Sequence, residues 1–228
     1  AIFVNTTAFP TFIAAAKQAG VRRFVLASSV AAYGSSTEDA TEDKKLYPTT
    51  KYAQGKHFCE TWTWLMKSST FCVTITRSAS VCGVSSRMRF DTTVNKMIHD
   101  AMNTGVITVN GGEQKRSHIS IQDLCRAYKM LMIASTDRIN GEVFNLVSEN
   151  LTVKELALMV AEITGAKVNF KERTDDRSYS VDGTKAKEML GFEPKQTIRD
   201  VVEYMTTLFQ GGYWKDTSAP KYTNIIAL

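Results

Sequence analysis

The sequence contains few cysteines, and none of them has the spacing of a metal site or a disulfide framework. The four cysteines lie far apart, at Cys59, Cys72, Cys82 and Cys125. The three histidines are equally dispersed, at His57, His99 and His118. No Cys-x-x-Cys pair or cysteine–histidine cluster occurs, so we expect neither a zinc site nor a disulfide-stapled domain, and no other metal. Unpaired cysteines favour a cytoplasmic protein.

Long apolar runs and long runs of one charge are also missing. No apolar stretch reaches the length of a transmembrane helix, and no signal-peptide pattern is found, so we expect no membrane partner. The 28 basic and 23 acidic residues give a net charge of +5. These charges are dispersed, which favours a solvated surface over a nucleic-acid interface. The chain has 228 residues, 43% of them hydrophobic, which is enough for one or two globular domains.

A short apolar run near the start of the chain predicts a buried strand, and the candidate site lies where this strand ends. Phe24, Val25 and Leu26 are followed by small residues, which is typical of a buried parallel strand. Ser28 and Ser29 stand where this strand is expected to end. Ligands of open α/β sheets bind at the carboxyl ends of the strands, so these two hydroxyls mark a candidate site.

A tyrosine and a lysine follow in a segment with helical character. Tyr52 and Lys56 are four residues apart, which places their side chains on one face of a helix. An ammonium beside a phenol stabilises the phenolate, so the pKa of the tyrosine falls toward neutrality. With a serine hydroxyl nearby, the pair suits moving a proton on and off an alcohol while a hydride leaves the carbon.

A second tyrosine–lysine pair, Tyr47 and Lys51, has the same spacing. Pro48 disfavours the α conformation for the residue before it and suits the first turn of a helix, so Tyr47 is expected just outside the helix. The later pair lies inside the helix and is followed by Glu60, four residues after its lysine. We therefore predict that the later pair is the functional one.

Four segments occur in a fixed order along the chain. The first is VNTTAFPTFIAAAKQAGVRRFVLASSVAAYG, and the others are TITRSASVCG, ITVNGGEQKRSHISIQDLCRAY and RTDDRSYSVDGTKAKEMLGFEPKQTIRDVV. Together with the Tyr/Lys pair they resemble the extended short-chain dehydrogenase/reductase family of nucleotide-sugar epimerases, reductases and dehydratases. The ordered set is far more specific than a single tyrosine–lysine pair, and it covers nearly the whole chain.

The resemblance implies an α/β fold with a doubly wound, parallel, Rossmann-type sheet and a small C-terminal α/β substrate-binding lobe. We expect residues 1–82 in the dinucleotide-binding domain and residues 83–228 mainly in the lobe, with residues 118–146 partly returning to the Rossmann domain. The sequence has no G-x-G-x-x-G turn, which binds the cofactor pyrophosphate in such folds. We therefore expect the first βα units to be missing, and the 228 residues alone to bind cofactor weakly or remain catalytically silent.

The family's site residues transfer onto named positions of this sequence. The implied catalytic residues are Ser29 (four residues before Tyr33), Tyr52 and Lys56. The implied cofactor is NAD or NADP, with NAD preferred, and Lys56 is expected to hold the nicotinamide ribose. The residues expected beside this cofactor are Asn5, Ser28, Tyr52, Lys56, Ser78, Ala79 and Ser80.

Three further residues are implied to bind a nucleotide-diphosphate sugar. Arg116 corresponds to an arginine that grips the diphosphate, because a guanidinium makes bidentate contacts to phosphate oxygens. Arg173 corresponds to a second such arginine, although the family's Arg-Pro-Gly-Asp reads Arg-Thr-Asp-Asp here. Asn95 is expected to contact the sugar or phosphate.

Departures from the family pattern reduce the number of reactions that the chain is expected to catalyse. Dehydratases of the family carry an Asp-Glu pair directly after the serine or threonine, where this chain has Val30 and Ala31. A carboxylate is needed there to move protons during dehydration, so we expect an epimerase or a keto-sugar reductase. A reductase of a non-sugar alcohol stays open as an alternative, although Arg116 argues against it. We also expect a homodimer.

Apolar patterns predict individual elements as well. We expect a strand at residues 1–4, and a helix at residues 48–67 that turns Phe58, Trp62 and Leu65 toward the core.

Other signals concern the chain after residue 86. A helix is expected at residues 87–104. Asp123 is expected to cap a helix that runs to residue 133, and Thr152 with Glu155 to form a capping box. Residues 214–222 are expected to form a loose tail.

Overall fold

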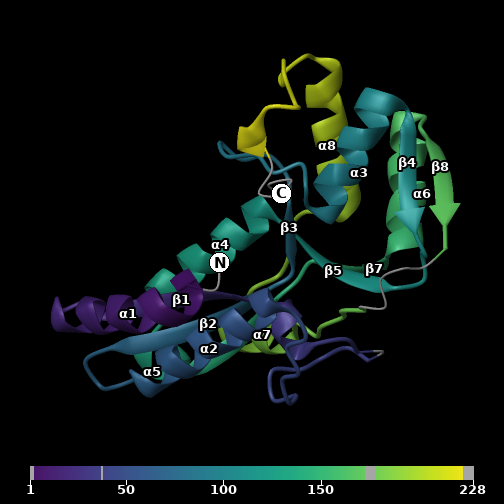
Figure 1. Cartoon of the computed structure of the whole chain (residues 1–228). Coiled ribbons are helices and arrows are strands. Elements are labelled where there is room, and N and C mark those ends of the chain that lie inside the picture. The colour runs from purple at the N-terminus through teal and green to yellow at the C-terminus, as the bar shows by residue number, and fades with distance from the viewer. Residues whose placement is uncertain (1–2, 37, 173–177, 223–228) are drawn as a thin grey trace. The chain divides into compact units, whose positions relative to one another are not determined.

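A computed structural model describes residues 3–36, 38–172 and 178–222 of the chain. The chain divides into two compact units (Figure 1), each made of three separate segments. The first unit contains residues 1–79, 124–147 and 177–193, and the second contains residues 80–123, 148–176 and 194–228.

The first unit is built on a sheet of three parallel strands in the order β1-β2-β6. The strands are β1 (Arg23–Ser29), β2 (Cys72–Ser78) and β6 (Glu142–Leu146). The helices are η1 (a π-helix, Val4–Ala8), α1 (Phe9–Gln18), η2 (a 3₁₀ helix, Val30–Tyr33), α2 (Lys51–Leu65), most of α4 (Ile121–Ile133), α5 (Thr136–Ile139) and α7 (Thr184–Leu190). Because parallel strands end at the same edge of a sheet, Ser29 and Ser78 lie in register at the carboxyl ends of β1 and β2.

Helices cover both faces of this sheet, since alternate residues of β2 contact different helices. Ile75 packs in one core cluster with Cys59 of α2, and Val73 in another with Ile13 of α1. On the opposite face, the Thr74 hydroxyl donates to a carbonyl oxygen of α5, and the Thr76 hydroxyl shares a hydrogen bond with a tyrosine of α4. All seven residues of β2 are therefore buried, as in a doubly wound parallel sheet.

Residues 3 and 4 are helical, which corrects the strand expected at residues 1–4 for these two positions, and residues 1–2 lie outside the described chain. Phe3 has helical dihedral angles, and η1 begins at Val4. Both side chains are largely exposed. A run of four apolar residues does not distinguish a strand from a helical turn by periodicity, and residues 3–4 have no partner strand in the described part of the sheet.

Helix α2 begins at Lys51, three residues later than expected, because Thr50 caps it by accepting a hydrogen bond from the Ala53 N–H. Its buried face also differs from the prediction. Phe58 is 36% exposed and Leu65 is 62% exposed, whereas Glu60 is buried. The prediction from apolar residues was wrong here because polar side chains of α2 have buried partners on the sheet.

The second unit has two small sheets. The first has the order β3-β5-β7 and the second pairs β4 with β8 in parallel. The strands are β3 (Ser80–Cys82), β4 (Val106–Asn110), β5 (Lys115–Ser120), β7 (Glu149–Thr152) and β8 (Lys167–Lys171). The helices are α3 (Thr93–Thr104), α6 (Val153–Thr164), α8 (Ile198–Gln210) and η3 (Pro220–Tyr222). Helices α3, α6 and α8 contact one another around one apolar core.

The boundaries of the two units differ from those expected from the sequence. The first unit ends at Ala79 rather than at residue 82, because β3 pairs with β5 inside the second unit. The segment 124–147 returns to the first unit, compared with the expected 118–146. Residues 177–193 return as well, which the sequence did not indicate, and α7 within them packs against β6.

Helix caps in the second unit follow the sequence in one place and depart from it in another. Thr152 and Glu155 form the expected capping box at the start of α6. Asp123 does not cap α4, since its own N–H donates to the Ser120 hydroxyl at that helix start. The Asp123 carboxylate instead accepts hydrogen bonds from two backbone N–H groups before α8, at Lys195 and Gln196.

Two other expectations for this unit were wrong. Helix α3 begins at Thr93 rather than at residue 87. The segment expected as a loose tail packs on Phe90, whose ring centroid lies 5.4 Å from that of Trp214 and 5.2 Å from that of Tyr222.

Among the helices formed by residues 3–36, 38–172 and 178–222, none is long and apolar enough to cross a membrane.

Candidate functional site

Helix α2 carries the predicted tyrosine–lysine pair. Tyr52 is in its first turn and 47% exposed, and the Lys56 Nζ lies 5.7 Å from the centroid of the Tyr52 ring. Tyr47 precedes the helix in a loop, where its ring lies beside the ammonium of Lys45. The structure therefore brings Tyr52 and Lys56 together on one helix and keeps Tyr47 off it, as the position of the proline indicates.

Lys56 connects α2 to the sheet. Its Nζ donates a hydrogen bond of 2.8 Å to the carbonyl oxygen of Ala27, two residues before the end of β1. Burial lowers the pKa of Lys56 from its ordinary value, and this effect outweighs nearby Cys59 and Glu60, which raise it. The lysine is thus a half-buried cation held at the carboxyl end of the strand.

Ser29 ends β1 in an extended conformation. Its Oγ accepts a hydrogen bond of 3.2 Å from the Ala31 N–H and so caps the short helix η2. A hydroxyl that accepts one bond still has its O–H to donate. Ser29 can therefore donate to a substrate oxygen without losing this cap.

Ser28 lies beside Ser29 but belongs to a buried polar cluster that we define as Ser28, Tyr33, Glu60, Arg77 and Asn145. The Ser28 hydroxyl donates to the Glu60 carboxylate. The Arg77 guanidinium forms an ion pair of 2.8 Å with the same carboxylate. The O–H of Ser28 is thus used inside the protein, and a cofactor contact predicted for this residue would have to be made by its oxygen as an acceptor or by its backbone.

Tyr33 completes the cluster and is not a second candidate base. Its hydroxyl donates to the Asn145 Oδ1 at 2.8 Å and accepts from the Arg77 guanidinium at 2.9 Å. Burial, only partly offset by Arg77, raises the pKa of Tyr33 to about 12. Sequence reasoning missed the role of Arg77, although an arginine inside a β-branched strand that is expected to be buried signals a buried acidic partner.

Asn5 lies against α2. Its backbone carbonyl accepts a hydrogen bond from the Cys59 Sγ at 3.1 Å. A Cβ atom added at Gly55 would lie 3.0 Å from the Asn5 Cβ, so the glycine permits a close approach of η1 to α2. This approach brings Asn5 close to the helical turn that carries Lys56, where the resemblance expects a cofactor contact.

Ser78 and Ala79 lie at the carboxyl end of β2. Ser78 is buried, and within the described part of the chain its hydroxyl has no hydrogen-bond partner. Ala79 donates its N–H to the carbonyl of Leu146. A buried hydroxyl without a described partner at the end of β2, together with the Lys56 ammonium held near the end of the adjacent strand β1, fits the polar end of a nicotinamide nucleotide. Ser80 belongs to the second unit, where it pairs with His118.

The predicted substrate residues of the second unit have different environments. Asn95 is buried, accepts a hydrogen bond from the Gly83 N–H and donates one to the Arg89 carbonyl, so its side chain anchors the loop before α3. Arg116 lies at intermediate exposure on β5, the central strand of its sheet, and donates to the Lys115 carbonyl. Arg173 lies outside the described residues.

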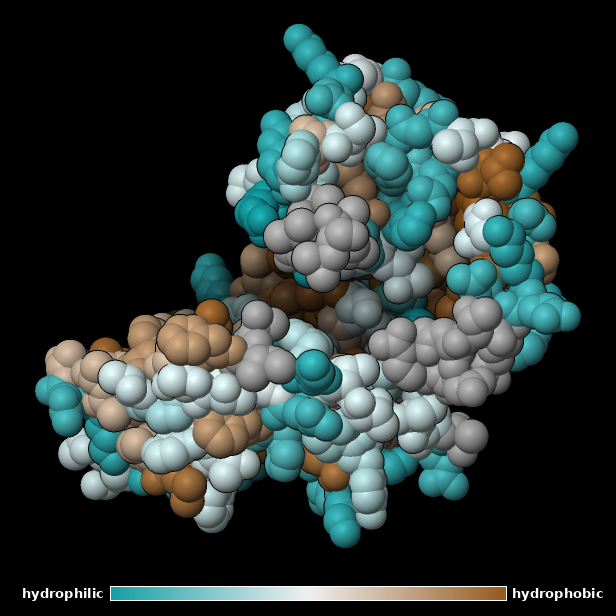
Figure 2. Space-filling model, viewed as in Figure 1, coloured by the Kyte–Doolittle hydropathy of each residue, from teal (hydrophilic) through white to brown (hydrophobic). Residues whose placement is uncertain are grey.

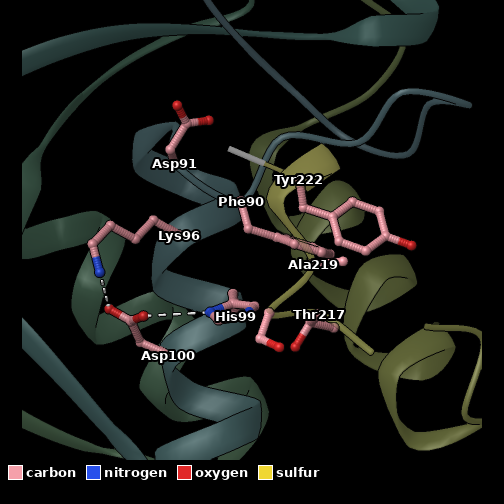
Figure 3. Close-up of a pocket in the computed structure, with 9 residues that line it drawn as sticks. Phe90, Asp91, Lys96, His99, Asp100, Thr217, Ala219 and Tyr222 are labelled. Atoms are coloured by element: carbon pink, nitrogen blue, oxygen red, sulfur yellow. Dashed lines mark hydrogen bonds and ion pairs between the residues drawn. The ribbon is translucent and has the colours of Figure 1, made fainter. Parts of the chain in front are cut away.

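The second unit also has a pocket of about 260 Å³ (Figure 3). Its lining residues come from the segment before α3, from α3 itself and from the C-terminal segment: Phe90, Asp91, Lys96, His99, Asp100, Thr217, Ser218, Ala219 and Tyr222. Lys96 and Asp100 form an ion pair of 2.5 Å, and the His99 ring stacks on Phe90. None of the described residues predicted from the sequence as site residues is among those that line this pocket.

The doubly wound sheet, with Ser29 at a strand end and a tyrosine–lysine pair on the adjoining helix, has the arrangement of a short-chain dehydrogenase-type protein. Residues 2–146 match the model of the NAD dependent epimerase/dehydratase family. This match covers more than half of the chain, and the chain therefore belongs to that family. The predicted family and fold class are confirmed.

The chain is also similar to individual proteins that act on or bind nucleotide sugars by name. The chain is 24% identical to the uncharacterized UDP-glucose epimerase YtcB of Bacillus subtilis (strain 168), over 91% of this chain and 68% of the relative. It is 28% identical to UDP-glucuronic acid decarboxylase 4 of Arabidopsis thaliana, over 92% of this chain but about half (49%) of that protein. A solved structure of MoeE5 with UDP-glucuronic acid and NAD superposes with a TM-score of 0.81 at 25% identity, covering 92% of this chain and 72% of that chain.

Proposed function

We propose that this chain provides the acid–base site of an NAD(P)-dependent nucleotide-sugar epimerase or keto-sugar reductase. The observation that carries this proposal is the position of Tyr52 and Lys56 on one helix, with Lys56 bonded to β1 two residues before Ser29. A half-exposed phenol, a cation and a hydroxyl donor at one strand end fit proton exchange with an alcohol.

Each of the three residues has a distinct role. Tyr52 takes the proton from a sugar hydroxyl and returns it to the keto oxygen. Lys56 stabilises the phenolate of Tyr52 by its positive charge, which the surrounding protein screens less than bulk water would. Ser29 donates its O–H to the same substrate oxygen and orients the sugar. The nicotinamide cofactor supplies hydride exchange at the sugar carbon when it is bound.

The cofactor is held by the first unit in this proposal. The residues that would hold its nicotinamide end are Asn5, Lys56, Ser78 and Ala79. The fit rests on the buried Ser78 hydroxyl and on the half-buried ammonium of Lys56, which suits a ribose diol. NAD is preferred because the matching family model is NAD dependent.

The substrate class follows from Arg116 and from the relatives. A guanidinium on the second unit suits a diphosphate, which it binds through two parallel N–H donors. MoeE5 was solved with UDP-glucuronic acid, and YtcB is a UDP-glucose epimerase by name. We therefore propose a nucleotide-diphosphate sugar as the substrate. Val30 and Ala31 follow Ser29 without a carboxylate, which disfavours dehydration.

The test compares two tyrosine variants in the protein with its full natural sequence. Tyr52→Phe should lower turnover of UDP-glucose or UDP-glucuronic acid with NAD by ~10²–10⁴-fold, because general acid–base catalysis contributes about that much. Tyr47→Phe is the matched control and should retain turnover. Product sugars are followed by NMR and reduced cofactor by absorbance. An equal loss in both variants, or full activity in Tyr52→Phe, contradicts the proposal.

A non-sugar alcohol remains the alternative substrate class. The same assay distinguishes it if simple secondary alcohols are added to the panel. Turnover that depends on Tyr52 but occurs only with alcohols lacking a diphosphate would keep the catalytic site and reject the nucleotide-sugar assignment.

A further inference from the structure

Lys56 and Glu60 are oppositely charged residues of α2 that have different partners. Glu60 follows Lys56 by four residues, a spacing at which opposite charges on a helix usually pair. In the described chain the Glu60 carboxylate forms its ion pair with Arg77 of β2 instead, and the Lys56 ammonium bonds the Ala27 carbonyl. The lysine is thus left without the carboxylate closest to it in sequence.

The Arg77 side chain makes a multidentate contact with Glu60. Its Nε lies 3.2 Å from both carboxylate oxygens, and one of its terminal nitrogens lies 2.8 Å from the Oε2. The Ser28 hydroxyl donates to the other oxygen, Oε1. All three side chains are buried, so these bonds are made away from water, where an unpaired charge is costly.

The guanidinium is itself fixed from its other side. Its second terminal nitrogen donates to the Tyr33 hydroxyl at 2.9 Å and to the Glu42 carbonyl at 3.0 Å. Tyr33 is held in turn by Asn145 of β6. Arg77 is therefore anchored to η2 and to the loop that contains Glu42, and it holds the carboxylate against β2.

We propose that Arg77 is a positioning residue that keeps the Glu60 carboxylate away from Lys56, so that the ammonium remains available to Tyr52 and to a bound ribose. If Arg77 lost its charge, Lys56 would become the nearest cation on α2 for a buried carboxylate. A salt bridge between them would draw the lysine away from Ala27 and neutralise the charge that stabilises the phenolate. This inference rests on the proposed roles of Tyr52 and Lys56.

The pKa of Lys56 tests the positioning role of Arg77 directly. Protein labelled with ¹³C-lysine is titrated by NMR, and the Cε signal of Lys56 is assigned with Lys56→Arg. In the natural sequence, burial lowers the pKa of Lys56, and Cys59 and Glu60 raise it by a smaller amount. Arg77→Gln should raise the pKa of Lys56 by about one unit or more, as a released carboxylate would.

The double variant Arg77→Gln/Glu60→Gln separates positioning from a purely structural role. It removes the released carboxylate, so the pKa of Lys56 should return to the value of the natural sequence or fall below it, because Glu60 already raises that value. If Arg77 only stabilised the fold, the single variant would leave this pKa unchanged, or the double variant would not restore it. Either result overturns the proposal.

A second variant covers the case in which Arg77→Gln does not fold. Arg77→Lys keeps a charge at this position but cannot contact Glu60, Tyr33 and the Glu42 carbonyl at once. It should give a smaller upward shift, again removed by Glu60→Gln, and no shift in folded Arg77→Lys overturns the proposal. The titration needs no substrate, so its result is independent of whether turnover of nucleotide sugars is found.

Discussion

Lys56 and Ala27 are joined by a hydrogen bond of 2.8 Å from the lysine ammonium to the backbone carbonyl. The bond connects the helix that carries Tyr52 to the strand that ends in Ser29. It involves a backbone acceptor, so it does not depend on which side chain stands at position 27. The tyrosine–lysine pair is therefore fixed relative to the strand end by the main chain, and the predictions below start from this arrangement.

The first prediction concerns the diphosphate. Arg116→Ala should weaken binding of UDP-glucose by ~1.5–3 kcal/mol, because a charge-assisted hydrogen bond to phosphate is lost. Arg199→Ala is the matched control, since Arg199 pairs with Glu162 on the surface of the same unit. Calorimetry measures both affinities, and NAD affinity should change in neither. Unchanged UDP-glucose binding in Arg116→Ala would remove the diphosphate assignment.

The second prediction concerns self-association. Large apolar side chains are exposed on η1, α1 and α2, and Figure 2 shows hydrophobic surface over α1. These side chains are Phe3, Val4, Phe12, Phe58, Trp64 and Leu65. If they form the interface of the expected homodimer, Trp64→Glu should yield a monomer by placing a charge in a desolvated contact.

Light scattering measures the mass of both proteins at matched concentration. Tyr204→Glu, at an exposed aromatic position on α8 of the second unit, is the control and should keep the mass of the natural protein. A dimer that persists in Trp64→Glu would show that another surface forms the interface.

The third prediction concerns pH. His118 is fully buried, and neither ring nitrogen has a hydrogen-bond partner among the described residues. Burial, with a smaller contribution from Arg116, lowers the pKa of His118 to about 4. The unfolded chain therefore binds more protons than the folded chain between about pH 6.5 and pH 4, so stability is lost as the pH falls through this range.

The expected loss between pH 7 and pH 5 is about 2 kcal/mol for this residue. His118→Phe removes the titrating group and should reduce the pH dependence by that amount, measured by urea unfolding at both pH values. His57→Gln changes an exposed histidine and should leave the dependence as it is. An equally steep dependence in His118→Phe would show that other groups cause it.

The fourth prediction separates two tyrosines by stability. Tyr33→Phe removes a hydroxyl that bonds Arg77 and Asn145 in a buried cluster, which should destabilise the protein by ~1–3 kcal/mol. Tyr52→Phe removes a half-exposed hydroxyl and should change stability by less than ~0.5 kcal/mol. Urea unfolding of both variants measures the difference, and equal losses would contradict the assignment of Tyr33 to structure.

The sequence predicted those parts that depend on local pattern. The strand before Ser29, the helix with Tyr52 and Lys56 and the capping box at Thr152 each follow from residues close together in the chain. Propensity, capping and helical spacing act over a few residues, so a single sequence contains the information for them.

Features that depend on distant partners were not predicted. The burial of Glu60 follows from Arg77, seventeen residues away in another element. Asn95 is buried because a loop folds back onto its helix. Strand β3 has only three residues and exists through its pairing with β5. In each case the decisive energy is a contact whose second partner the local pattern does not identify.

Gly55 stands one residue before the lysine, in the interior of α2, and its lack of a side chain allows the approach of Asn5. A glycine there costs the helix roughly 0.5–1 kcal/mol relative to alanine. Replacing helical glycines by alanine is a common way to make proteins more heat-resistant. At this position the added methyl group would press on Asn5, which would have to give way by a few tenths of an ångström, so a packing cost would oppose the gain in helix propensity and Gly55→Ala is a poor choice for raising heat resistance.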